Sequence, residues 1–216
     1  MGKSCCENKA SELAALRAKQ GNVLKIVLLL NAVMFGIEFV AGYLSKSSAL
    51  MADSLDMFGD AAVYGLSLYA LHRGALWRAR AGLSKGLVMA AFGLFVLGQV
   101  AYRTWVGTVP VAETMGLIGG MALAANAICL WLLYAHRSDD INMRSTWLCS
   151  RNDIIANVGV LGASSLVALT QSGIPDRVVG FGIAILFLKS AYEVLTEARA
   201  EIRESLTHSE HLAKTV

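Results

Sequence analysis

Three aspartates lie within one long apolar stretch of the chain: Asp53, Asp56 and Asp60. With 3.6 residues per helical turn, positions i, i+3 and i+7 lie on one face of a helix, so the three carboxyl groups form a stripe. Ionised carboxylates this close repel each other in dry surroundings, so a metal cation, protons or a basic side chain must share the space. We interpret a basic partner as the weakest option; Lys189 is the one basic residue that lies well inside another apolar stretch.

A thiol and a further carboxylate stand four residues apart in a later apolar stretch. Cys149, Asp153 and Asn157 are spaced i, i+4 and i+8 and share one helical face. Asp56 and Asp60 on one helix, with Cys149 and Asp153 on another, offer four ligands to one tetrahedral cation. Three oxygens and one sulfur suit Zn²⁺ or Cd²⁺ better than Mg²⁺ or Ca²⁺, which prefer larger all-oxygen shells.

Other polar residues in the apolar stretches are candidates for the route or for support of the site. Asn31 and Glu38 are seven residues apart, and Glu38 could carry a proton or a metal ion in transit. A plain hydrogen bond between helices explains them equally well. We interpret Asp53 as bonding a neighbouring helix, and Asn157 as a donor that orients Asp153 rather than as a ligand.

The cysteines do not resemble the disulfide framework of a secreted protein. Cys5 and Cys6 are adjacent in a polar segment, whereas Cys129 and Cys149 fall in apolar ones, so we expect reduced thiols. The adjacent pair lacks the C-x-x-C spacing of a strong metal site. It is a weaker candidate for capturing a soft metal ion, and two unstructured thiols are the simpler interpretation.

Long apolar stretches must position all these residues. Of 216 residues, 56% are apolar and only 16% are charged, and the mean hydropathy is +0.54. Six stretches are each near the roughly 20 residues that a bilayer-spanning helix needs. Their predicted limits are 23–44, 48–71, 83–106, 113–135, 147–170 and 177–198. The composition excludes a soluble enzyme, an outer-membrane barrel and a disordered chain, and it predicts an all-α membrane protein with six transmembrane helices.

The basic residues predict the orientation of these helices. With a cytoplasmic N-terminus, 16 of the 19 Lys and Arg residues fall on the cytoplasmic side and three on the other. Both termini are therefore expected inside. The predicted organisation is a cytoplasmic tail over 1–22, a transmembrane domain over 23–198 and a short cytoplasmic tail over 199–216. The first tail is too polar for a signal-peptide core.

Two blocks of this sequence resemble the cation diffusion facilitator family. The block Ser48–Asp60 is similar to the second helix of that family, and Trp147–Val160 to the fifth. The resemblance implies a bundle in which Asp56, Asp60 and Asp153 bind Zn²⁺ or a similar ion that is exchanged for protons. Cys149 stands where the family usually has His, which favours thiophilic ions.

The resemblance also implies a function and a location. It indicates a secondary-active transporter, not an enzyme, that exports Zn²⁺ or Cd²⁺, with Co²⁺ as a further candidate, by alternating access. The metal is then a substrate, no cofactor or nucleic acid is expected, and the protein belongs in the bilayer of a bacterial inner membrane. About eighteen residues follow Ala198, too few for the family's usual cytoplasmic domain, so we expect a short form whose dimer, if formed, rests on the membrane helices.

Two other classes of protein remain open from the sequence. A passive metal channel or a membrane metal sensor would use the same ligands and differ only in coupling. An intramembrane aspartyl protease also places two aspartates on separate helices, and Phe58-Gly59-Asp60 faintly resembles its Gly-x-Gly-Asp motif. Position 57 is Met rather than Gly, and no Pro-Ala-Leu motif accompanies it, so this class is remote.

Overall fold

Six α-helices make up the regular structure of the part of the chain that the computed structural model describes, residues 5–69, 75–135 and 143–214. The helices are α1 (Cys5–Leu44), α2 (Ser48–Tyr69), α3 (Ala75–Val106), α4 (Ala112–Ala135), α5 (Met143–Thr170) and α6 (Ile174–Lys214). The prediction of an all-α protein with six long helices is confirmed.

The helix bounds agree best with the predicted spans where polar residues lie close to both ends of the apolar stretch. Helix α2 and helix α4 begin and end within two residues of their predicted limits. Helices α1 and α6 are much longer, with 40 and 41 residues, and run through most of the predicted polar tails. The apolar pattern marks the part of a helix that crosses a bilayer, whereas the helix itself continues for as long as its backbone bonds do.

Five of the helices contain a segment that is long and apolar enough to cross a membrane. The segments are Lys25–Leu44, Ala79–Val106, Ala112–Leu132, Asp153–Thr170 and Ile174–Glu204. Helix α2 has the length but is interrupted by its three aspartates. Helix α2 packs against all five other helices, so its polar residues do not have to face lipid.

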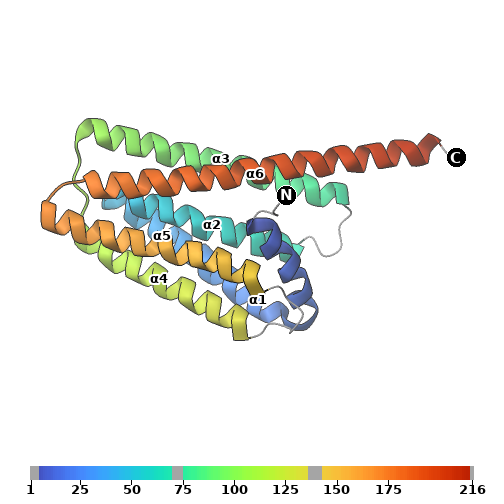
Figure 1. The fold of residues 1–216 in the computed structure, drawn as a ribbon, viewed down its shortest axis with the longest axis horizontal. Coiled ribbons are helices and arrows are strands. Elements are labelled where there is room, and N and C mark those ends of the chain that lie inside the picture. The colour runs from blue at the N-terminus through green and yellow to red at the C-terminus, as the bar shows by residue number, and fades with distance from the viewer. Residues whose placement is uncertain (1–4, 70–74, 136–142, 215–216) are drawn as a thin grey trace.

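The helices run roughly side by side (Figure 1), with α1 packed mainly on α2, α3 on α6 and α4 on α5. Residues 45–47, 107–111 and 171–173 connect helices at one end of the bundle, which we call the short-loop end. At the opposite end, the termini end, α6 extends well beyond its neighbours. By the predicted topology the termini end is cytoplasmic.

Close packing joins the α3–α6 pair to the other helices. Gly93 of α3 lies so near α6 that a Cβ atom there would be 2.6 Å from a methyl carbon of Leu188. On the adjacent face of α3, the ring of Phe92 packs 5.3 Å from that of Phe58 on α2, and Phe58 packs at the same distance from Phe35 on α1. Aromatic rings at these separations attract each other beyond their simple burial.

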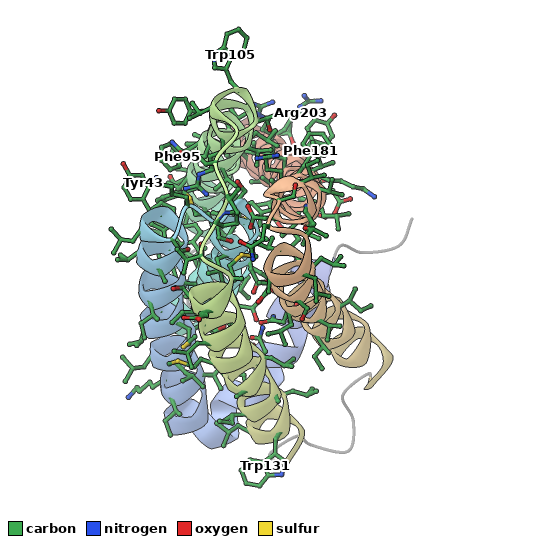
Figure 2. The ribbon with its side chains drawn as sticks, turned by 90° about the vertical axis from the view of Figure 1, so that its left-hand side faces the viewer. Tyr43, Phe95, Trp105, Trp131, Phe181 and Arg203 are labelled. Atoms are coloured by element: carbon green, nitrogen blue, oxygen red, sulfur yellow. The ribbon has the colours of Figure 1, made fainter. Side chains whose placement is uncertain are left out.

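The perimeter of the bundle is apolar and aromatic. Figure 2, which looks onto the short-loop end, shows Tyr43, Phe95, Trp105 and Trp131 projecting outward. Trp105, near the end of α3, is 92% exposed, and Trp131, near the opposite end of the bundle on α4, is 65% exposed. Tryptophan is enriched at both interfaces of a membrane, so these side chains suit a bundle surrounded by lipid.

Candidate metal site

Helix α2 changes from complete burial to partial exposure along its length. All eight residues from Ser48 to Leu55 are at most 1% exposed, so the first two turns are covered on every side. Asp53 belongs to this covered part, whereas Asp56 and Asp60 are only half-buried. The aspartate stripe therefore begins inside the sealed part of the bundle and runs toward the termini end.

Helix α5 packs against α2 and carries the second half of the predicted site. Asp153 is half-buried. Asn157, one turn further along, is 1% exposed and donates its Nδ2–H to the backbone carbonyl of Asp153 at 2.8 Å. The Oδ1 atom of Asn157 is buried and accepts no hydrogen bond from the described part of the protein. This amide oxygen is therefore available to a ligand or to water.

Glu38 of α1 and Asp53 of α2 form a buried acidic pair. The two side chains are 0% and 1% exposed, and their carboxyl groups are close enough to share a hydrogen bond. Among the described residues no group donates to any of the four carboxyl oxygens. Two carboxylates are both acceptors, so the pair needs a proton or a cation between them.

The acidic groups of three helices influence one another. Asp53 interacts electrostatically with Asp153 of α5, and Glu38 with Asp56 of α2. In the part of the chain whose side chains are described, no three His, Cys, Asp or Glu residues converge closely enough to hold a metal ion. Asp56, Asp60 and Asp153 are described and do not form such a group. Cys149, the predicted sulfur ligand, lies in α5, but its side chain is outside the described residues, so the four-ligand set stays a prediction.

The remaining predicted residues are placed as follows. Asn31 is 1% exposed and donates from Nδ2 to the carbonyl of Val27 at 2.9 Å and to the sulfur of Cys129 at 3.4 Å, a contact between α1 and α4. Its Oδ1 atom is buried without a donor among the described groups. The side chains of Cys5 and Cys6 are outside the described residues.

The sequence interpretation missed a polar cluster at the short-loop end. Asp176, in the first turn of α6, is 1% exposed, and Arg103, near the end of α3, is 4% exposed. Arg103 is one of the three basic residues that the predicted topology assigns to the non-cytoplasmic side. It is buried and donates to the carbonyl of Gly42 and the hydroxyl of Ser48, each at 3.4 Å. An acidic residue in the first turn of a helix was the available signal, although it did not reveal the partner.

Most of this chain is similar in sequence to a known protein family. A family model described as the cation efflux transmembrane domain matches residues 24–202. The zinc transporter ZitB of Yersinia pestis is 27% identical over 195 residues, which cover 84% of this chain and 62% of the relative. The metal cation efflux system protein CzcD of Cupriavidus metallidurans is 26% identical over 193 residues, covering 81% and 61%.

A third relative is described as a cadmium, cobalt and zinc/H(+)-K(+) antiporter from Bacillus subtilis. It is 24% identical over 194 residues, covering 81% of this chain and 62% of that protein. The chain thus spans less than two-thirds of the length of the curated relatives it matches. The match over residues 24–202, together with a six-helix bundle that holds buried acidic side chains, leads to one conclusion: the chain belongs to the cation efflux transmembrane-domain family.

Proposed function

We propose that the protein exports a divalent transition-metal ion from the cytoplasm, with Zn²⁺ or Cd²⁺ as the substrate and Co²⁺ as a further candidate. The ion binds between α2 and α5 to Asp56, Asp60, Cys149 and Asp153. Protons move in the opposite direction, and the site alternates between the two sides of the membrane. The similarity to a zinc transporter and to a cadmium, cobalt and zinc antiporter supports this choice of ions.

One observation carries the proposal. Carboxyl groups of α1, α2 and α5 are buried or half-buried in an apolar bundle, and the Glu38–Asp53 pair has four buried oxygens without a donor in the described structure. Ionisable groups at such depth are costly, about 2.5–3.5 kcal/mol each at the lowest estimate, so they usually mark an ion pathway. A cation or protons would offset that cost here.

Charge balance supports exchange with protons. Three carboxylates and a thiolate carry four negative charges, and a divalent ion neutralises only two of them. An empty site with four negative charges is too costly in an apolar bundle, so it should take up protons when the metal leaves. Metal binding then displaces protons, because thiol and carboxyl groups ligate in their deprotonated forms. The displaced protons belong to the coupled cluster as a whole.

Flux through the purified protein in proteoliposomes tests this function. Zn²⁺ and Cd²⁺ transport should accelerate when protons flow down their gradient in the direction opposite to the metal. Asp153→Asn should abolish the transport, because this change removes a ligand charge with little change in volume. Ser164→Ala, on the same helix but near its other end, is the matched control and should transport normally.

Proton release on Zn²⁺ binding between pH 6 and 8 separates exchange from passive permeation. Release that disappears in Asp153→Asn supports exchange at this site. Metal flux that ignores the pH gradient, together with binding that releases no protons, would identify a passive channel. Binding without any flux would instead indicate a membrane metal sensor.

A further inference from the structure

The polar cluster at the short-loop end joins the start of α2 to the start of α6. The Asp176 carboxylate accepts three hydrogen bonds: from the hydroxyl of Ser47 at 2.6 Å and from the backbone N–H groups of Ser48 at 2.7 Å and Ala49 at 3.0 Å. Ser47 in turn accepts from the N–H of Leu50 at 3.1 Å. The first N–H groups of a helix have no partner within it, so a side chain of α6 completes the beginning of α2.

Arg103 and a glycine complete this contact. The Arg103 guanidinium lies beside the same turn and donates to the hydroxyl of Ser48, to the carbonyl of Gly42 on α1 and to the sulfur of Met51. Gly180 of α6 lies against the backbone of Ser48, where a Cβ atom would be only 2.6 Å from the carbonyl carbon. Three helices therefore converge on the first turn of α2.

The first two turns of α2 lie between the aspartates and the short-loop end, and their burial shows that this end of the bundle is closed. Residues 48–55 are buried on every side, and the half-buried Asp56 and Asp60 follow toward the termini end. An ion at the aspartates therefore has two turns of fully enclosed helix between it and the short-loop end. By the predicted topology that end faces away from the cytoplasm, so export requires this enclosure to open.

We propose that Asp176, with Ser47 and the first two N–H groups of α2, is a latch that closes the external end of the route and must break once in each transport cycle. This inference rests on the proposed export function. The bonds of the latch can be broken there because they lie at an end of the bundle, where water can replace a lost partner. Gly180 also leaves no side chain to interlock with α2 as α6 moves away.

The latch can be tested by the reactivity of a cysteine placed beneath it. Ala49 is 0% exposed and small, so Ala49→Cys introduces a thiol that a membrane-impermeant maleimide reaches from the external side only when the latch is open. The parent carries this reporter with Cys5, Cys6 and Cys129 replaced by serine. The same protein without the reporter gives the residual labelling of Cys149.

Two matched serine variants separate the latch from general loosening. Ser47→Ala removes the hydroxyl that donates to Asp176, whereas Ser164→Ala removes a hydroxyl that donates to Ala112 at 2.9 Å between α4 and α5 near the same end. A hydrogen bond to a charged group is strong enough that we expect Ser47→Ala to raise the labelling rate by about tenfold or more. Ser164→Ala should leave the rate unchanged.

Labelling during transport distinguishes a latch that opens in each cycle from a contact that stays closed. In vesicles that transport Zn²⁺, labelling of the parent should rise when metal and a proton gradient are supplied together, and Asp153→Asn should remove that rise. Three results would each overturn the latch. The first is an equal labelling rate in the parent, Ser47→Ala and Ser164→Ala, and the second is an equal rise in both serine variants. The third is metal flux in the parent without any rise in labelling. Absence of metal flux in the parent would reject the proposed function instead, and the two serine variants would still decide whether this end opens.

Discussion

Glu38 and Asp53 face each other across the interface of α1 and α2, and both are acceptors when ionised. An amide in place of one carboxyl group would supply the missing donor. At an alkaline pH where the shared proton is lost, we therefore expect Glu38→Gln to stabilise the metal-free protein by about 1.5–3 kcal/mol, the usual contribution of a hydrogen bond to a charged group. Thermal unfolding of the detergent-purified protein measures the effect.

Glu38→Ala is the control for this prediction. It removes one carboxyl group without supplying a donor and leaves a cavity in a site that is 0% exposed, so its unfolding midpoint should lie below that of Glu38→Gln. Equal midpoints for the two variants would show that the donor at this position contributes nothing.

On the proposed function, the choice of metal should also depend on a single residue. Cys149 is the one sulfur among the four proposed ligands, and thiolate prefers softer ions than imidazole does. Cys149→His should therefore lower the ratio of Cd²⁺ to Zn²⁺ binding affinity, measured by competition between the two metals on the purified protein. Cys129→Ser, the matched change at another thiol in an apolar helix, should leave the ratio unchanged. A constant ratio in Cys149→His would remove Cys149 from the ligand set.

At the scale of whole elements, the backbones of α2 and α6 come close together at Gly180. A Cβ atom there would lie 2.6 to 2.8 Å from backbone atoms of Ser48 and Ala49, which cannot turn aside as a side chain can. Gly180→Ala should therefore lower the unfolding midpoint by pushing α6 away from α2. Gly182→Ala, two residues along the same helix with nothing within 4 Å, should be neutral or slightly stabilising because alanine favours helix. Similar midpoints for the two would contradict the close packing.

The elements were largely predictable from the sequence, whereas the contacts between them were not. Apolar stretches located all six helices, because a helix that crosses a bilayer must be apolar over most of its length. The spacing of Asp56 and Asp60 also placed them on one face, which is a local property of a helix. The bond between Ser47 and Asp176 joins residues 129 positions apart, and no local pattern specifies such a pair.

At the scale of the whole molecule, the sidedness of the bundle follows from its charges. Sixteen basic residues on one side and three on the other predict that the termini end is cytoplasmic. An introduced cysteine at Val109, which is 47% exposed at the short-loop end, should react with an impermeant thiol reagent from outside the cell. Arg78→Cys should react only from the inside. Labelling of both positions from the same side would reject this topology.

The Asp176 carboxylate of the latch also affects the electrostatic potential that a metal ion meets at the external end. The amino end of a helix carries about half a positive charge, and in the closed state the Asp176 carboxylate neutralises it. When α6 withdraws that carboxylate, the external mouth of the route gains an uncompensated positive pole. This pole repels any cation, and it repels a divalent metal ion twice as strongly as a proton at the same distance. On the proposed mechanism, the open latch would therefore hinder the return of a metal ion more than the entry of a proton while the site is being reset.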